Sequence, residues 1–441
     1  MATTRQTRVV KKSKKRLNGS PINEPETSVG LSRENGDTMK KLLAVSAAFG
    51  LAISLSCTTL HAATLSVWAV DEPDNYTEKM AQEFAKLHPD VHLQIRKVGF
   101  AALNDETMRA VMSGNVPDVV PIDNPNTAMF ASKNALLDLG PYLAKSKVID
   151  AKQIFPGPLK NASWNGKVYA IPRGTNTLAL YYNEDMFKAA GLDPNHPPQT
   201  WDELYNDAKK LTDAQHNVYG LAFSAINNEE GVFQFLPFIQ ATGADWDKLS
   251  DPGAARAAAF WQKLMDAKVA SPDTLTHTQS EAAATFINGN AAMDIDGPWE
   301  LNAVEKGAKF KWRVALLPTE KAGGTRASAL GEQNHAILRG AKDPDTAFQF
   351  LEYMYSQRGR DWNEFGMLPP SKDTNTPNPK WPQAYKAFNE QMEYARARGP
   401  NPQWPKVSKA ISDAMQSVLT HQAAPAQAMT TAGQTVQGVT R

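Results

Sequence analysis

The sequence predicts an α/β protein with two lobes, each a mainly parallel sheet flanked by helices. Residues 65–123 alternate apolar runs and helical periodicity in the order β-α-β-α-β, which is typical of a parallel sheet covered by helices. A second α/β block follows the polar stretch 173–177 and has its own polar loops at the predicted strand ends. A chain of 441 residues is long enough for each block to bury a core.

The first block contains three predicted strands and two predicted helices. The helix 76–87 carries apolar residues at Tyr76, Met80, Phe84 and Leu87 and stops at His88-Pro89. The other elements are strands at 65–70, 91–95 and 119–123 and a helix at 103–113. In parallel sheets, ligands bind beyond the carboxyl ends of the strands. The polar residues at these ends are Asp71, Glu72, Asp123 and Asn124.

Two β-rich runs, 168–171 and 178–182, flank a polar connector, Arg-Gly-Thr-Asn-Thr, at 173–177. Pro172 stops the first run, and Asn183 ends the second. We interpret the connector, which contains Asn176, as joining two lobes and lining the cleft between them. Replacing Asn176 with Ala is then expected to weaken ligand binding and to leave the ligand-free melting temperature nearly unchanged.

The second block and the C-terminal part continue the alternation. One further helix, 130–143, is expected before the connector, and the helix at 232–241 is expected despite Pro237. The segment 366–370 reads as extended, and the chain from 381 onward as mostly helical. The remaining predicted helices are 184–190, 201–211, 254–267, 281–287 and 345–356, and the strands are 218–223, 291–295, 312–317 and 336–338.

The N-terminal region predicts export. Residues 1–63 hold 10 Lys and Arg against 4 Asp and Glu, whereas the remainder holds 37 against 42. A basic start at 39–41, an apolar run at 42–55 and small residues to 63 are typical of a secretory signal peptide, 39–63. Residues 1–38 are expected to be a disordered leader or to precede the true start at Met39. Periplasmic localisation follows.

Cys57 is the single cysteine, so no intramolecular disulfide is possible. Its position after an apolar run leaves open a lipoprotein with an acylated Cys57. Ser54, three residues before it, departs from the leucine usual there, which favours ordinary cleavage after Ala62 or Ala63.

Catalytic motifs and metal-binding motifs are not evident in the sequence. It contains no G-x-S-x-G, H-E-x-x-H, phosphate-binding loop or G-x-G-x-x-G. His88 and His92 have a zinc-like spacing, but Pro89 between them argues against a shared helical face. Asp294 and Asp296 share one face of a predicted strand without an evident catalytic partner. We therefore expect no enzyme activity, metal or cofactor, and the mildly acidic body gives no basic footprint for nucleic acid.

Aromatic residues near loops point to a different chemistry. An aromatic ring stacks on the apolar face of a sugar, while carboxylates and amides bind its hydroxyls. Trp299 follows the turn Gly297-Pro298 at a strand end and is the strongest candidate, with core packing as the alternative for each ring. The other aromatic candidates are Trp68, Tyr182, Trp362 and Trp404.

Several segments in order resemble one family. They are the segments 113–120 (SGNVPDVV), 166–172 (GKVYAIP) and 288–299 (NGNAAMDIDGPW), together with the signal peptide and Trp68. The mature chain resembles the extracellular solute-binding proteins of ATP-driven importers, in the carbohydrate-binding group that includes maltose-binding protein. The resemblance implies the two-lobe periplasmic-binding-protein fold of type II, with the ligand in the interlobe cleft.

The resemblance also implies lobe limits and ligand contacts. Lobe one would comprise 64–175 and 319–367, and lobe two 176–318 and 368–441. Asn176 stands where the maltose binder has an acidic residue, which puts maltose itself in doubt. The polar run at 331–334 suggests added hydrogen bonds, with surface exposure as the alternative. The implied contacts are Asp71 or Glu72, Asp123 or Asn124, Asn176, Glu230, Trp299, Glu332, Gln333 and Asn334.

Three functions remain in competition. The leading hypothesis is a monomeric binding protein that delivers a mono- or oligosaccharide to two membrane permease subunits with a cytoplasmic ATPase. The second is the same fold binding a polyol phosphate or another non-sugar solute. A phosphate would call for a basic cleft, and Arg173 is the one cation in the connector. The third, a secreted carbohydrate-active enzyme, is disfavoured because no catalytic motif is evident.

Overall fold

The computed structural model describes residues 63–72, 74–374 and 380–440. The predicted leader, Cys57 and all of the predicted signal peptide except Ala63 lie outside these residues. The described residues belong to one compact unit, Leu60–Arg441. Within it are two separate sheets, and we define the first and second lobes by them.

The sheet of the first lobe has five strands in the order β2-β1-β3-β11-β6. β1 pairs in parallel with β2 and β3, whereas β11 runs antiparallel to both β3 and β6. The carboxyl ends of β1 and β3 therefore meet the beginning of β11 at one edge. The strands span Ala63–Val70 (β1), Val91–Val98 (β2), Val119–Asp123 (β3), Ala170–Pro172 (β6) and Gln333–Ile337 (β11).

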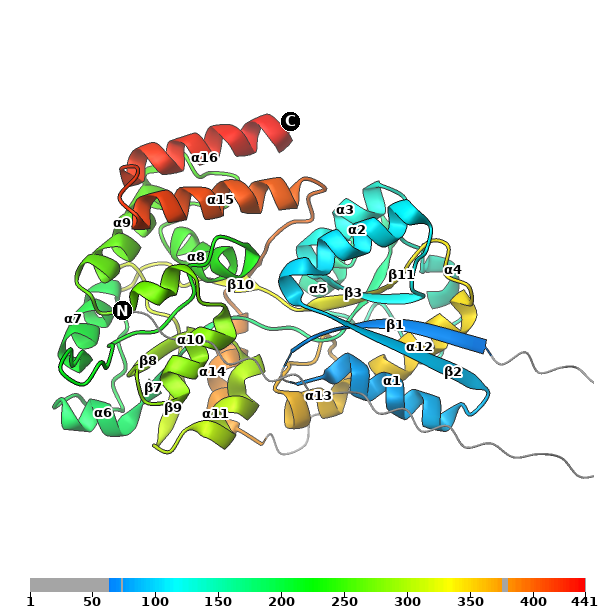
Figure 1. Cartoon of the computed structure of the whole chain (residues 1–441), viewed down its shortest axis with the longest axis horizontal. Helices are drawn as coiled ribbons and strands as arrows, with labels where there is room; N and C mark the ends of the chain where they lie inside the picture. The colour runs from blue at the N-terminus through cyan, green and yellow to red at the C-terminus, as the bar shows by residue number, and fades with distance from the viewer. Residues whose placement is uncertain (1–62, 73, 375–379, 441) are drawn as a thin grey trace, which may run out of the picture. The chain divides into compact units, whose positions relative to one another are not determined.

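Helices cover both faces of this sheet (Figure 1). α1 (Tyr76–Leu87) buries Tyr76, Met80 and Phe84 in one cluster with Leu65 and Val67 of β1, and α12 (Pro344–Ser356) joins the same cluster. α2 (Leu103–Ser113) and α3 (Thr127–Ser132) pack on the opposite face. Alternate residues of a strand point to opposite faces, so β1 supplies both cores.

The predicted helix 130–143 is two short helices, α3 and α4 (Gly140–Leu143). Asn134 has a positive φ of 59°, and Leu136 forms an isolated bridge with Leu338 beside the sheet. A left-handed residue ends a helix, and pairing with the sheet then competes for the backbone. The rest of this lobe holds α5 (Pro156–Asn161) and the hairpin of β4 (Ser163–Trp164) and β5 (Lys167–Val168).

The sheet of the second lobe corrects the expectation of a mainly parallel arrangement. β7 (Ala179–Asn183) lies between β8 (Met293–Asp296) and β9 (Trp312–Ala315), and both pairings are antiparallel. The predicted strand 218–223 forms only isolated parallel bridges, Tyr219 with Ala291 and Ala222 with Asp294. The first sheet therefore combines parallel and antiparallel strand pairs. In the second sheet the paired strands are antiparallel, and parallel pairing is confined to single bridges.

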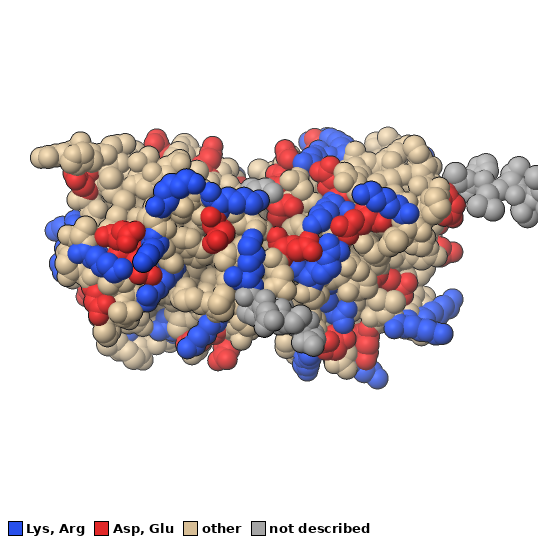
Figure 2. Space-filling view, turned by 90° about the horizontal axis from the view of Figure 1, so that it is seen from below, with Lys and Arg blue, Asp and Glu red and all other residues tan. Residues whose placement is uncertain are grey.

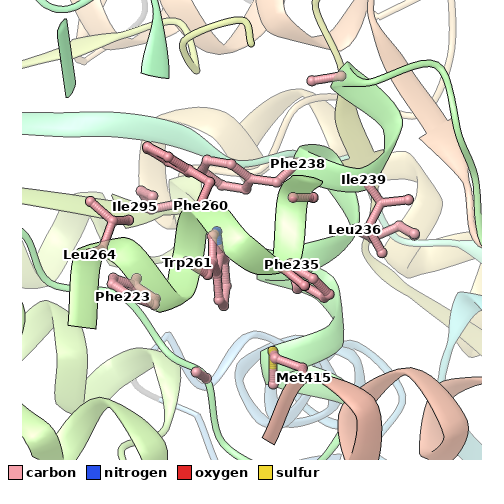
Figure 3. Close-up of a cluster of buried hydrophobic side chains, with 14 of the residues drawn as sticks. Phe223, Phe235, Leu236, Phe238, Ile239, Phe260, Trp261, Leu264, Ile295 and Met415 are labelled. Atoms are coloured by element: carbon pink, nitrogen blue, oxygen red, sulfur yellow. The ribbon is translucent and has the colours of Figure 1, made fainter. Parts of the chain in front are cut away.

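Two predominantly apolar helices, α8 (Glu229–Ala241) and α9 (Pro252–Asp266), form the centre of the second core (Figure 3). Trp261 of α9 is fully buried, with its ring 4.6 Å from that of Phe223 and 4.9 Å from that of Phe235. Every residue of α8 from Gly231 to its end is buried, including Pro237. Only its first two residues, Glu229 and Glu230, are partly exposed.

The remaining helices of the second part surround this core (Figure 1). α15 and α16 pack against each other and against α9. These helices are α6 (Glu184–Ala189), α7 (Trp201–Leu211), α10 (Gln279–Ile287), α11 (Leu301–Gly307), α14 (Pro382–Met392), α15 (Trp404–Leu419) and α16 (Pro425–Thr440). α13 (Arg358–Phe365) instead lies beside α1 of the first lobe (Figure 1), where Arg360 pairs with Glu83.

Three chain segments cross between the sheets side by side. Thr175 bridges to Leu368, and Asn176 bridges to Gly331. β10 (Ser328–Leu330), which pairs with β12 (Ala395–Ala397), buries Ala329 in the second core, and Thr319 bridges to Thr200. The lobe limits remain a prediction, and these contacts favour a return to the first lobe near Gly331 rather than at 319.

The surface of the described part carries both signs of charge. On the face in Figure 2, Lys and Arg are interspersed with Asp and Glu rather than gathered in a broad basic patch. No helix among the described residues has the length and apolar character needed to cross a membrane.

Candidate functional site

A cavity of about 550 Å³ lies between residues of the two lobes. The first lobe contributes the loop after β1, the short helix Phe100–Ala102 after β2, the end of β3 and the beginning of β11. The second lobe contributes the first turns of α8 and α10 and the short helix Pro298–Glu300 after β8. This volume is within the range of small-molecule sites.

Eight of the thirteen residues predicted to bind ligand line this cavity. They come from strand ends, the connector and helix starts, which are the positions that the sequence analysis emphasised. The eight are Asp71, Glu72, Asp123, Asn176, Glu230, Trp299, Glu332 and Gln333.

The other five do not line it. Trp68 on β1 is buried, and the guanidinium of Arg96 on β2 lies over its ring. Tyr182 packs in the second core, and its hydroxyl donates to the Pro194 carbonyl. Asn334 donates to Thr127 and Asn161, and Asn124 accepts from Arg398. Trp404 is fully buried at the start of α15. Each of the five is buried close in sequence to a predicted strand end or loop. Closeness in sequence to such a loop therefore did not predict that the side chain lines the cavity.

Arg173 is the centre of a buried ion cluster under the cavity. Its guanidinium lies 3.2 Å from Glu72, 3.7 Å from Glu332 and 3.5 Å from Asp361, and it also contacts Asp74. The ring of Tyr76 lies 4.0 Å from its Cζ. The Arg173 side chain is fully buried, so its charge is neutralised within this cluster.

Burial raises the pKa of three carboxyl groups in this cluster, those of Glu72, Glu332 and Asp361, although Arg173 opposes the shift. The pKa of Asp361 rises to about 8, and that of Glu332 is raised as well. The pKa of Glu72 is raised well above its ordinary value by burial and by the charge of Asp74. One guanidinium faces four carboxyl groups, so the cluster has an excess of acid.

Arg398 is the centre of a second cluster, and this one joins the two lobes. It makes two bonds to the Asp123 carboxylate, 2.8 and 3.0 Å long, and a third of 3.2 Å to Asn124. It also donates to Glu229 at the start of α8, 2.5 Å away, and Trp404 Nε1 donates to the other oxygen of Glu229. The two-bond geometry fixes the end of β3 against α8.

Asn176 and Gln333 present unpartnered acceptors at the cavity. Asn176 Nδ2 donates to Glu332, 2.7 Å away, and Gln333 Nε2 donates to Glu72, 3.0 Å away. The amide oxygens of both residues have no hydrogen-bond partner among the described residues, although the side chains are more than nine-tenths buried. Buried amides normally satisfy their oxygens, so these two are unsatisfied acceptors in the residues that line the cavity.

Gly331 makes room for this arrangement. A Cβ at this position would lie 2.0 Å from Asn176 Oδ1 and 2.6 Å from the Phe233 ring. The close approach therefore requires glycine, and any side chain would displace the connector or Phe233.

The wall from the second lobe combines aromatic rings with a carboxylate. The rings of Phe233 and Trp299 are 6.1 Å apart and tilted by 50°. Trp299 folds back over Gly297, where a Cβ would lie 1.9 Å from the ring. Glu230 accepts from the backbone N–H of Gln279, 2.9 Å away, and burial raises its pKa.

The sequence analysis missed several lining residues. Asp74 lies two residues after the predicted Glu72, and Glu229 directly precedes the predicted Glu230, so both belong to polar loops that the sequence indicates. Phe233, Met367 and Arg398 carried no usable signal. Arg398 meets Asp123 across 275 residues of sequence, and no local pattern indicates such a contact.

The remaining sequence candidates lie elsewhere. Asp294 and Asp296 are buried on β8, and burial together with nearby acidic groups raises the pKa of both. His88 stacks on Phe84, and His92 is exposed on β2. Trp362 is fully buried against Tyr385. No group of three or more His, Cys, Asp or Glu within the described ranges is placed to hold a metal ion.

Comparison with known proteins agrees with this architecture. A curated relative, the sn-glycerol-3-phosphate-binding periplasmic protein UgpB of Salmonella typhimurium, is 25% identical over 73% of this chain and 78% of its own. The structure of a solute-binding protein of Thermotoga lettingae bound with α-D-tagatose is 25% identical, with a TM-score of 0.77 over 86% of this chain and 100% of that one. Maltose-bound MalE3 of T. maritima shares the fold at 23% identity and a TM-score of 0.76, again over 86% and 100%.

A family model supplies the assignment. The model of the bacterial extracellular solute-binding proteins matches residues 69–361, which include most of the lining residues and all strands of the two sheets except most of β1. The chain therefore belongs to the bacterial extracellular solute-binding proteins.

Proposed function

We propose that this chain is the periplasmic substrate-binding component of an ABC importer and that it captures a sugar or polyol in the interlobe cavity. The composition of the cavity carries the proposal. Carboxylates and two unpartnered amide oxygens provide acceptors for hydroxyl groups, and Trp299 provides an aromatic surface. Similar proteins are described with tagatose and maltose, which supports the same ligand class here.

The charge of the cavity disfavours the phosphate alternative. UgpB is described as binding sn-glycerol 3-phosphate, so the alternative has a basis among the relatives. Seven Asp and Glu line the cavity, and Arg398 is the one Lys or Arg among the described lining residues. Arg398 is already bonded to Asp123 and Glu229, and Arg173 beneath is bonded to acidic residues. A phosphate would have to displace these pairs, at a high cost because they are buried.

Capture and release would depend on relative motion of the lobes. The side-by-side crossings at Thr175–Leu368 and Asn176–Gly331 are short enough to act as a hinge. A ligand that contacts both walls favours the closed form, which two permease subunits with a cytoplasmic ATPase would recognise. The chain would act as a monomer and would make or break no covalent bond in the ligand, consistent with its family.

Isothermal titration calorimetry tests the proposal. The panel would contain neutral mono- and disaccharides, polyols and sn-glycerol 3-phosphate, with Trp299→Ala as the site variant. We expect micromolar or tighter binding of at least one sugar or polyol and at least about fivefold weaker binding by the variant, because stacking contributes about 1 kcal/mol or more. Heat from sn-glycerol 3-phosphate alone would replace the proposal with the phosphate alternative.

A further inference from the structure

The cavity contains more acid than its arginines can neutralise. Arg398 is shared between Asp123 and Glu229, and Arg173 among Glu72 and three other carboxyl groups. Asp71 is paired with Lys97 at the rim, 3.4 Å away. Each of these carboxyl groups therefore has a cation within reach.

Glu230 is the exception among the lining acids. Its carboxylate accepts from the backbone N–H of Gln279, and among the described residues it forms no ion pair with a Lys, Arg or His. The charges that act on it are acidic: Glu281 raises its pKa, and Glu230 in turn raises those of Asp296 and Glu300. An unpaired carboxylate that is mostly buried among other acids is stabilised by a cation.

The surroundings of Glu230 suit a cation that belongs to a ligand. Trp299 lines the same wall, and an indole face attracts an ammonium group. Phe233, next to Trp299, already holds a guanidinium 4.5 Å from its centre, which shows that this wall accepts cations. The unpartnered oxygens of Asn176 and Gln333, both more than nine-tenths buried, add acceptors for further donors of the ligand.

We propose that Glu230 and Trp299 form a subsite for a protonated amine, and that the ligand is an amino sugar or an amino-substituted polyol. The amine would donate to the Glu230 carboxylate and lie on the indole, while its hydroxyl groups bind the amides of the connector side. This proposal rests on the proposed function, because it specifies the class of sugar that the same cavity takes.

Calorimetry at pH 7 on matched ligands tests the subsite. The sets are glucose, glucosamine and N-acetylglucosamine; galactose, galactosamine and N-acetylgalactosamine; and cellobiose with the disaccharide of glucosamine. In the set that binds, we expect the amine to bind about tenfold tighter than the neutral sugar, because a charge-assisted hydrogen bond replaces a neutral one. Acetylation removes the charge and is expected to abolish the advantage.

Glu230→Gln keeps the acceptor for Gln279 and removes the charge, so it is expected to reduce the ratio of amine to neutral affinity to about one. The matched control is Glu305→Gln at an exposed position of α11, which is expected to retain the ratio. Equal or tighter binding of the neutral sugar overturns the subsite and leaves the proposed function intact. An amine preference that survives in Glu230→Gln also overturns the subsite.

If no sugar, polyol or amine binds, the proposed function fails as well. The wild-type ratio decides the ligand class even if Glu230→Gln does not fold.

Discussion

Two buried arginines, Arg173 and Arg398, form ion clusters at the cavity, and the two clusters connect different parts of the protein. Arg173 gathers carboxyl groups from the loop after β1, the start of β11 and α13, next to its own strand β6. Arg398 instead joins Asp123 at the end of β3 to Glu229 on α8. The first cluster supports one wall of the cavity, whereas the second links the two walls.

The difference indicates separate consequences for stability and for coupling. Loss of Arg173 would leave four carboxyl groups without their cation in one place. Loss of Arg398 would leave only two carboxyl groups, Asp123 and Glu229, without their cation, but it would remove the ionic link between α8 and β3. The two replacements therefore distinguish a supporting role from a coupling role.

The largest effect is expected for Arg173→Met. The substitution keeps much of the volume and leaves buried carboxyl groups uncompensated, which costs about 3–5 kcal/mol of unfolding free energy. Urea unfolding followed by circular dichroism measures it. Arg109→Ala, an exposed arginine paired with Glu106, is the control and is expected to cost less than about 1 kcal/mol. Equal losses in the two variants would contradict a structural role for the Arg173 cluster.

Arg398→Met is expected to cost about 3 kcal/mol and to separate the unfolding of the two lobes. With the link removed, tryptophan fluorescence and circular dichroism should give transitions that no longer coincide. Arg173→Met should keep coincident transitions in the same assay. Coincident transitions in Arg398→Met would show that the lobes are coupled by other contacts.

Asp361→Asn tests the excess of acid in the Arg173 cluster through pH. Because the folded-state pKa of Asp361 is raised to about 8, the folded protein binds more protons than the unfolded chain between pH 4 and 8. The contribution of this group therefore decreases stability as the pH rises through that window, by at most about 1.4 kcal/mol per pH unit. The unfolding free energy of the variant, relative to wild type, should increase from pH 5 to pH 8 in urea titrations. A relative stability independent of pH would contradict the assignment.

The smallest effect is expected for Asn176→Ala. The sequence suggested no change in ligand-free stability, but Asn176 donates to the buried Glu332. We now expect a loss of about 1 kcal/mol in stability together with weaker ligand binding. Thermal unfolding and calorimetry measure the two effects, with exposed Asn389→Ala on α14 as the control. Unchanged ligand affinity would remove Asn176 from the site.

Sequence reasoning predicted cavity-lining residues where local rules apply. The rule of strand carboxyl ends identified Asp71, Glu72 and Asp123, and the turn at Gly297 correctly indicated that Trp299 lies at a strand end. The two α/β blocks followed from the alternation of strand and helix patterns, and the helix with Pro237 followed from its apolar content. The antiparallel second sheet did not follow, because strand direction depends on how distant segments pair.

Distant contacts also explain the errors in the site. Trp404 was a plausible stacking residue from its loop-like surroundings, but the fold buries it and directs its Nε1 to Glu229. Arg398 gave no local signal, and its role depends entirely on bringing β3 and α8 together. Both outcomes are decided by tertiary packing.

The most direct measurement is a crystal structure of the protein with the tightest ligand from the calorimetric panel. Our account predicts the ligand between the lobes, with hydroxyl groups bonded to the Asn176 and Gln333 oxygens and one face or amine against Trp299 and Glu230. A ligand bound outside this cavity, or inside it without contact to either wall residue Glu230 or Trp299, would contradict the account.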